Sequence, residues 1–266
     1  MNNFNLIVTG KSGAGKQPRI DVLVKQYGLK QLSTGDIFRS YLSIYKKLDL
    51  NLDLEKFWDE EKANFVDDSK IIDSIKSGCK EKNIEIQDAL LGLKATRFVD
   101  QGLFVPDYIT NKLFEAAFLK HGGKGLTLDG YPRTKAQASF LLRLSLNEGA
   151  KIALIVLVEN KNELIIKRTV GRRICKNCGK VFHMEYKPPK DGKYCTDCNE
   201  EVIQRSDDTT EKIKIRLQEF KEKTLPAITY LEESGIPLVE VPGNLPVFTE
   251  EKVKESVMSK VSEYLD

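Results

Sequence analysis

Two groups of residues in this chain have types and spacings that indicate chemistry. The first is the run Gly10-Lys-Ser-Gly-Ala-Gly15-Lys16, which has the spacing GxxxxGK. Glycines at these places let backbone N–H groups turn toward an anion, while a helix start and the lysine add positive charge. The run follows an apolar stretch at 5–9 and precedes a helical pattern, as the motif requires. It therefore predicts a phosphate-binding loop, with a chance glycine-rich turn as the alternative.

The residues after this lysine, Gln17-Pro18-Arg19, lack the Ser or Thr that commonly follows it. Pro18 is sterically acceptable in the first turn of a helix, where its missing N–H breaks no helical bond. It nevertheless removes an N–H that could have met a phosphate. A charge-assisted hydrogen bond contributes ~1.5–3 kcal/mol, and Gln17 and Arg19 are the candidates to offset its loss.

The second group is a pair of cysteine knuckles, Cys175-x2-Cys178 and Cys195-x2-Cys198, with 16 residues between them. This spacing predicts a structural zinc site with four thiolate ligands and no open coordination position. Two redox pairs or free thiols are the alternatives. Gly179 and Asn199 directly follow the two knuckles, and both are turn residues that direct backbone amides toward thiolate sulfur.

Composition limits the classes of protein that these groups can belong to. The chain has 266 residues, a formal net charge of +3 and 41% hydrophobic residues. This charge is too balanced for a protein that binds nucleic acid through bulk charge. No apolar run reaches the ~18 residues of a membrane span, and the N-terminus has no secretory pattern. We expect a cytoplasmic protein without nucleic-acid or membrane partners.

The elements that must position these groups follow from hydrophobic patterning. Apolar runs predict strands at 5–9, 126–128, 151–158 and 237–241, and helical patterns lie near 18–27, 107–120, 134–148, 161–168, 209–233 and 249–265. The run at 151–158 is apolar almost throughout, which suits a parallel strand covered on both faces. Strands that alternate with helices predict an α/β fold with a doubly wound parallel sheet.

Two segments interrupt this alternation and are interpreted as insertions into one core. The core comprises residues 1–39, 103–168 and 216–266; a helical cap comprises 40–102 and a zinc-binding lid 169–215. The cap has three possible roles: an enlarged segment packed on itself, a surface for self-association or a partner, or a regulatory ligand site. The second role would rest on Phe57, Trp58 and Phe65.

Four further stretches complete a resemblance to a known family. They are Ser33-Thr-Gly-Asp36-Ile-Phe-Arg39; Asp129-Gly-Tyr-Pro-Arg-Thr134 with Gln137; Arg168-x3-Arg172-Arg173; and Arg205-Ser-Asp-Asp208 followed by Arg216. Together with the glycine-rich run, they resemble the motifs of the adenylate kinases, within the nucleoside monophosphate kinases. The resemblance covers nearly the whole chain outside part of 41–90.

This resemblance implies Mg²⁺-dependent transfer of a phosphoryl group from ATP to AMP, giving two ADP. It also implies that 40–102 closes over AMP and that the zinc-binding segment closes over ATP. Another nucleoside monophosphate kinase, with a GTP donor or a different acceptor, is one alternative. A non-catalytic nucleotide sensor is another, because the family has Gly-Thr-Gln where this chain has Gln17-Pro18-Arg19.

The resemblance also implies a role for each matching residue. The ATP-binding set is Gly13, Ala14, Gly15, Lys16, Gln17, Arg168, Arg172 and Leu245, with Arg168 stacked on adenine. The AMP-binding set is Thr34, Arg39, Val105, Gly130, Arg133, Gln137, Arg205 and Arg216, with Gln137 reading adenine. The catalytic set is Lys16, Arg133, Arg172, Arg205 and Arg216. The carboxylates expected to organise magnesium-bound water are Asp36 and Asp129.

Overall fold

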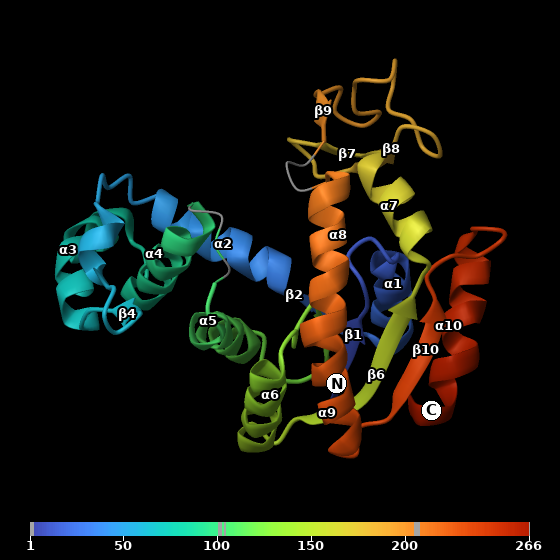
Figure 1. Ribbon diagram of the computed structural model, residues 1–266, viewed down its shortest axis with the longest axis horizontal. Coiled ribbons are helices and arrows are strands. Elements are labelled where there is room, and N and C mark those ends of the chain that lie inside the picture. The colour runs from blue at the N-terminus through green and yellow to red at the C-terminus, as the bar shows by residue number, and fades with distance from the viewer. Residues whose placement is uncertain (1–2, 101–102, 104, 205–207, 266) are drawn as a thin grey trace.

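A parallel five-stranded sheet lies at the centre of the molecule (Figure 1). The structure, a computed structural model, describes residues 3–100, 103, 105–204 and 208–265. The sheet has the order β10-β6-β1-β5-β2, and all four neighbouring pairs are parallel. Its strands are β1 (Phe4–Thr9), β2 (Lys30–Ser33), β5 (Leu126–Asp129), β6 (Lys151–Glu159) and β10 (Leu238–Pro242). This confirms the predicted doubly wound parallel core.

Helices cover both faces of the sheet, and side chains alternate between two hydrophobic cores. On β1, Leu6 and Val8 pack into one core, whereas Ile7 packs into the other. Strand β6 is buried from Ile152 to Val158, as its apolar run indicates. The core that holds Leu6 includes residues of α1 (Lys16–Tyr27), α7 (Asn162–Val170) and α10 (Glu250–Leu265); the other includes residues of α5 (Asp107–Lys120), α6 (Lys135–Asn147) and α9 (Leu225–Glu233).

Two elements of the core differ from the expectation. The pattern at 209–233 is not one helix: α8 (Thr210–Glu219) is followed by a π-helical turn (Phe220–Thr224) and then by α9. Pro226 lies in the first turn of α9 and has no N–H to continue the preceding bonding pattern. Strand β2 was not predicted, because Leu32 is its only buried apolar residue and four residues cannot establish a clear alternation.

The cap is built from α2 (Thr34–Lys46), a 3₁₀ helix (Leu54–Phe57), α3 (Asp68–Lys82) and α4 (Ile86–Asp100). A two-stranded hairpin of β3 (Trp58–Asp59) and β4 (Asn64–Phe65) lies among them. Helices α2 and α4 cross closely, since a Cβ at Gly92 would lie 2.2 Å from the Tyr41 carbonyl oxygen. The expectation that the cap helices pack on one another is confirmed.

An aromatic cluster with a buried arginine fills the interior of the cap. Trp58 packs edge-on against Phe65 and Phe98, with ring centroids 5.3 and 5.4 Å away. The Arg97 guanidinium lies 4.1 Å from the Trp58 ring centroid and pairs with Glu55 at 2.7 Å. Phe65 is only 9% exposed. Two of the aromatic residues proposed for self-association are therefore engaged mainly within the cap.

The lid is a small three-stranded antiparallel sheet beside the first turn of α8. It contains β7 (Arg172–Cys175), β8 (Val181–His183) and β9 (Val202–Ile203), in the order β8-β7-β9. Three of the four predicted domain boundaries fall inside helices α2, α7 and α8, so a continuous helix joins the cap to the core at one end and two helices join the lid to it; the boundary at 102/103 lies between α4 and α5. The division into three domains stays a prediction. Among the described residues, no helix has the length and apolar character needed to cross a membrane.

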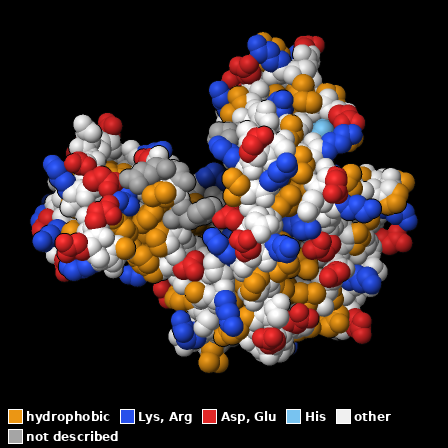
Figure 2. All heavy atoms as spheres, in the orientation of Figure 1, with side chains coloured by type: hydrophobic (Ala, Val, Ile, Leu, Met, Phe, Trp, Pro, Cys, Tyr) orange, Lys and Arg blue, Asp and Glu red, His pale blue; other side chains and the backbone are white. Residues whose placement is uncertain are grey.

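The cap and the lid project from the core in different directions (Figure 1). Figure 2 shows the surface notched between them, above the body that holds the sheet. The described elements therefore form a compact core with two separate projections.

Candidate functional site

The glycine-rich run forms the turn between β1 and α1, as predicted. Gly15 has a φ of 100°, and a Cβ there would lie 2.8 Å from the Gly243 carbonyl oxygen, so a glycine is required. Lys16 is the first residue of α1. Its Nζ donates to the carbonyl oxygens of Gly10 at 3.0 Å and Lys11 at 3.2 Å. The lysine thus folds back over the loop, and its ammonium group lies where an anion held by the loop amides would bind.

Several charged side chains share the electrostatic environment of this lysine. The pKa of Lys16 is lowered to about 8, mainly by burial; the carboxylate of Asp129 opposes this shift, and the cations of Arg133 and Arg172 add to it. Burial also lowers the pKa of Arg133; Asp129 opposes this shift, whereas the charge of Arg216 adds to it. Lys16 and Arg133 therefore both interact with Asp129, while Arg172 influences Lys16 and Arg216 influences Arg133.

Arg172 is held by a carboxylate to which sequence reasoning gave no role. Its Nε donates to Oδ2 of Asp208 at 2.8 Å, and its Nη2 donates to Oδ1. Asp208 is fully buried, and its carbonyl oxygen accepts from Nε2 of Gln204 at 2.9 Å. The acidic residue within an arginine-rich motif was the available signal, because a buried carboxylate requires a charged partner. Arg205, predicted to be catalytic and to bind AMP, lies outside the described residues.

The ends of β2 and β5 bring three predicted AMP-binding residues together. The Thr34 hydroxyl lies 3.1 Å from the Asp129 carbonyl oxygen and 3.0 Å from that of Gly130. Nε of Arg133 donates to the Gly130 carbonyl oxygen at 2.8 Å. Parallel strands end at the same edge of the sheet, which places these residues beside the phosphate loop.

Gln137 and Val105 lie next to the start of α5. The Gln137 carboxamide accepts from the Arg133 amide at 2.8 Å and donates to Oδ1 of Asp107 at 2.7 Å. The Val105 carbonyl oxygen accepts from the Thr110 hydroxyl at 3.4 Å. Both ends of the Gln137 side chain are engaged by protein groups, so its reading of adenine stays a prediction.

The two predicted magnesium-site carboxylates have different partners in the structure. Asp36 forms an exposed ion pair with Arg39, which is the residue predicted to hold the AMP phosphate. Oδ2 of Asp129 accepts from Nε2 of Gln31 at 3.2 Å, and the Gln31 side chain in turn bonds to Gln17 at 2.8 Å. Gln17 therefore reaches the environment of Asp129 through Gln31. The shared role of Asp36 and Asp129 at magnesium stays a prediction.

The turn after β10 packs directly on the phosphate loop. Nη1 of Arg168 donates to the Gly243 carbonyl oxygen at 3.1 Å, and its Nη2 donates to the Asn244 side chain. Leu245 follows in the same turn and is half-buried. The structure thus places Arg168 and Leu245, both predicted to contact the ATP base, on one wall beside the loop.

The four knuckle cysteines meet in the lid. Sγ of Cys175 lies 3.4 Å from that of Cys198, and Sγ of Cys178 lies 3.5 Å from that of Cys195. All four sulfur atoms lie within 4.8 Å of one another. A tetrahedron with a Zn–S bond of about 2.3 Å has sulfurs about 3.8 Å apart, so the cluster fits one zinc ion. The turn residues Gly179 and Asn199 both have positive φ, as their positions after the knuckles indicate.

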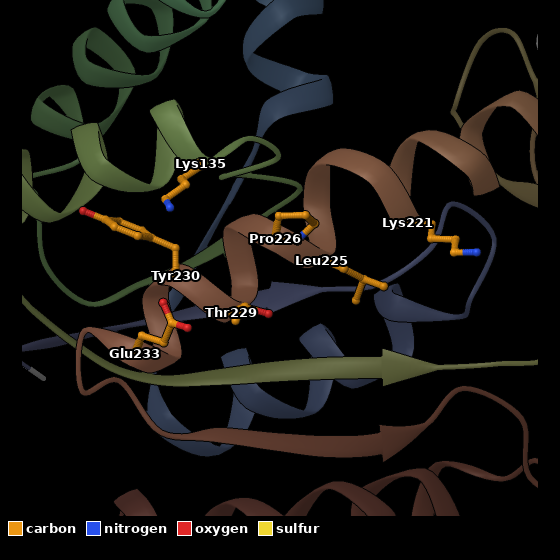
Figure 3. A pocket seen from close by; sticks show the side chains of 7 residues that line it. All are labelled: Lys135, Lys221, Leu225, Pro226, Thr229, Tyr230 and Glu233. Atoms are coloured by element: carbon orange, nitrogen blue, oxygen red, sulfur yellow. The ribbon is translucent and has the colours of Figure 1, made fainter.

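A groove of about 370 Å³ lies apart from this set of residues (Figure 3). It is lined by Lys135, Lys221, Leu225, Pro226, Thr229, Tyr230 and Glu233. None of these residues belongs to the predicted site. The groove is therefore not the nucleotide site that the sequence indicates.

A phosphate loop at the carboxyl edge of a parallel sheet, faced by arginines and flanked by two inserted segments, is the arrangement of nucleoside monophosphate kinases. The model of the adenylate kinase family matches residues 73–236. Adenylate kinase of Desulforamulus reducens is 33% identical over 234 residues, or 88% of this chain and 90% of that protein. For adenylate kinase of Clostridioides difficile the identity is 31% over 257 residues, or 96% and 97%. The chain belongs to the adenylate kinase family and is an enzyme of that family.

The lowered pKa of Lys16 predicts that ATP binding depends on pH. Below about pH 8 the side chain is a cation that attracts phosphate, and above it the neutral amine loses that attraction. The dissociation constant for ATP, measured without AMP, should therefore rise as the pH passes from 7 to about 10. The control variant Lys16→Met should bind weakly and show no such inflection. Parallel profiles for the two proteins would contradict the prediction.

The small interior of the lid predicts that its fold depends on zinc. Its buried apolar cluster is Cys175, Phe182, Cys195 and Val202, so two of the four members are metal ligands. Chelation, or Cys198→Ser, should release zinc and accelerate amide hydrogen exchange across 172–203. The matched control Cys79→Ser changes a buried cysteine of α3 outside the cluster and should retain zinc. Lid amides that remain protected after zinc removal would contradict this dependence.

Proposed function

We propose that this chain catalyses the reversible transfer of a phosphoryl group from Mg-ATP to AMP, giving two ADP. The observation that carries the proposal is a linked set of cations beside the phosphate loop: Lys16 interacts with Arg133 and Arg172, Arg133 interacts with Arg216, and Asp129 interacts with Lys16 and Arg133. Phosphoryl transfer requires aligned donor and acceptor groups and cations around the transferring oxygens, with little covalent participation by the protein. Family membership favours this chemistry over other uses of the same cations.

In this proposal, the two nucleotides bind on opposite sides of the transferring group. Lys16 and the loop amides of Gly13, Gly15 and Lys16 hold the ATP β-phosphate, and Ala14 and Gln17 line the same loop. Arg168 and the Leu245 carbonyl contact the ATP base. The residues for AMP are Thr34, Arg39, Val105, Gly130, Arg133 and Gln137. Binding of the AMP phosphate by Arg39 would require its ion pair with Asp36 to open or to be shared.

Arg172, together with Arg205 and Arg216, is assigned to the transferring phosphoryl group. Asp208 would act as a positioning residue, because its two carboxylate oxygens accept from Nε and Nη2 of Arg172 and so fix the plane of the guanidinium. This pairing keeps the arginine in one orientation while leaving its remaining donors available. The fork geometry of arginine suits phosphate oxygens better than the single ammonium of lysine does.

Two metal ions support the proposed reaction in different ways. Magnesium bound with ATP would neutralise phosphate charge, and carboxylate and water oxygens are its preferred ligands; Asp129, with Asp36, would orient its water molecules. Zinc in the four-thiolate cluster would stabilise the lid, and a closed lid excludes water from the transferring group. A cytoplasmic location is inferred, where reducing conditions keep the thiols available to zinc.

Two other functions remain as alternatives to the proposal. One is a nucleoside monophosphate kinase with a GTP donor or an acceptor other than AMP. The other is a nucleotide sensor without turnover, favoured by Pro18 in place of the threonine found in the family. The position of Lys16 over the loop and the fixed orientation of Arg172 favour an active enzyme over the sensor.

Self-association through 40–102 also stays a prediction. Phe65 and Trp58 pack with Phe98 inside the cap, so these rings offer less apolar surface to a partner than the sequence indicated. A dimer would have to use other residues of the cap surface. The internal packing therefore favours an enlarged cap over an interface.

The activity is tested with purified, zinc-replete protein, Mg-ATP and one nucleoside monophosphate at a time. ADP formation should be fastest with AMP and slower with GMP, CMP and UMP. Lys16→Ala should abolish ADP formation, because the loop loses its cation. Preference for another acceptor, or tight ATP binding without ADP above the Lys16→Ala level, would overturn the proposed reaction.

The state of association is tested by sedimentation of the intact chain across a wide concentration range. If the enlarged cap mediates self-association, the mean mass should rise with concentration above the 30.2 kDa of the single chain. A constant mass of about one chain would contradict self-association through 40–102.

A further inference from the structure

Arg19 lies fully buried behind the phosphate loop, within the segment where this chain departs from its family. It belongs to the second turn of α1 and has no exposed surface. Its Nη1 donates to the Gly15 carbonyl oxygen at 3.2 Å, and its Nη2 donates to the Pro242 carbonyl oxygen at 2.6 Å. The Phe248 ring covers the guanidinium, with its centroid 5.6 Å away. One side chain therefore joins the loop to the end of β10.

The charge of Arg19 is not balanced by a carboxylate. Within the described part of the chain, its hydrogen-bond partners are carbonyl oxygens, its Nε has no partner, and no acidic side chain pairs with it. Burial and, to a lesser extent, the charge of Arg168 lower the pKa of Arg19 to about 10, so the guanidinium remains charged at neutral pH. A buried cation without a counter-ion favours an anion nearby.

We infer that Arg19 is a positioning residue for ATP, and that it offsets the N–H and hydroxyl that Pro18 removes from the phosphate loop. This inference rests on the proposed binding of ATP phosphates at the loop. Arg19 faces away from the anion and acts through the backbone of the loop. Its substitution should therefore alter ATP affinity although it does not touch the nucleotide.

The bond to Gly15 acts on an amide expected to hold phosphate. The Gly15 carbonyl and the Lys16 N–H belong to one trans peptide, so they point in opposite directions. A cation that donates to this carbonyl holds the peptide plane and polarises it, which makes the N–H a stronger donor on the other side. The charge of Arg19 thus reaches the phosphate through one peptide group.

The bond to Pro242 acts on the wall expected to hold the ATP base. Arg19 holds the carbonyl of Pro242, and Arg168 holds the next carbonyl, that of Gly243. These two bonds fix the turn against the phosphate loop and so set the distance between the base and phosphate subsites. The hydrogen bonds of Arg19 go to Gly15 and Pro242 and not to Thr34 or Arg133, so the AMP side should be unaffected.

The other candidate to offset Pro18 has a different environment. The Gln17 side chain is exposed and bonds to Asp21 at 2.9 Å and Gln31 at 2.8 Å. These contacts direct its carboxamide along the surface of α1 toward Asp129. Arg19 is therefore the residue that acts on the loop backbone itself.

A double-mutant cycle tests this inference with Arg19→Gln, Pro18→Thr and the double variant, which restores the pair found in the family. ATP dissociation constants are measured by calorimetry without AMP. Arg19→Gln should raise the constant roughly 10-fold, the lower end of the effect of one charge-assisted bond. In the Pro18→Thr background the same change should have a clearly smaller effect, because the threonine supplies the missing donors. The matched control Lys25→Gln removes an exposed charge of α1 and should stay within about twofold of wild type.

Affinity for AMP separates positioning from a general loss of structure. The dissociation constant for AMP alone should be unchanged in every variant, and in turnover only the KM for ATP should rise. Equal weakening of both nucleotides, or an equal effect of Arg19→Gln in both backgrounds, would overturn the inference. If Arg19→Gln does not fold, Arg19→Lys decides: it keeps the charge but cannot reach both carbonyls, and ATP should bind about threefold more weakly with AMP unchanged.

The outcomes also separate this inference from the proposed reaction. ATP binding by the wild-type chain without ADP formation would overturn the reaction, while the cycle would still decide the role of Arg19 in binding. Absence of ATP binding by the wild-type chain would overturn both.

Discussion

Positive charge held together at the end of a parallel sheet is the constraint on which this structure depends. Burial lowers the pKa of Lys16, the charges of Arg133 and Arg172 lower it as well, and Asp129 opposes this shift without cancelling it. Such a group of cations is unfavourable in an empty site, and phosphate supplies the missing counter-charge. Between about pH 8 and the ordinary lysine pKa of 10.5, the unfolded chain binds more protons at Lys16 than the folded chain does. For this group alone, stability therefore rises with pH in that window, whereas anion binding weakens. The same residue thus opposes folding and favours the ligand.

Much of this arrangement was predictable from the sequence, because the core elements follow simple rules. Strand β6 has a long apolar run and the phosphate loop has fixed spacing, and both occur where they were expected. Strand β2 was not predictable, because four residues with one buried apolar side chain show no alternation of apolar and polar positions. The hydrogen-bond and ion-pair partners of the site residues were harder to predict from the sequence. Asp36 pairs with Arg39, and Gln137 bonds to Asp107. The motifs predict that Asp36, Arg39 and Gln137 contact substrate or magnesium-bound water, not one another or Asp107. Such pairings depend on which elements meet in space, and motif spacing does not record that.

The enlarged cap illustrates a different limit. Its helical periodicity was evident, but the sequence left open whether its aromatic residues faced a partner or one another. The structure places Arg97, which is 5% exposed, between Trp58 and the carboxylates of Glu55 and Glu60. A buried arginine is tolerated when aromatic faces and paired carboxylates surround it. This interior gives the inserted segment a packed core of its own.

Arg19 shows how an unfavourable local choice can be consistent with the whole. Pro18 removes an N–H donor from the start of α1, and an arginine on the apolar face of α1, one turn before Leu23, is unfavourable in isolation. The two departures lie next to each other in the sequence. Pro18 leaves the Lys16 N–H with fewer neighbouring donors. Arg19 places a cation at the Gly15 carbonyl, which belongs to the same peptide group as that N–H. Natural chains tend to break local rules at functional sites and to compensate nearby. The burial of Arg19 was predictable from the sequence, because Arg19 lies four residues before Leu23 and so on the same buried face of α1. Its two carbonyl partners were not predictable, because β10 meets the loop only in the folded sheet.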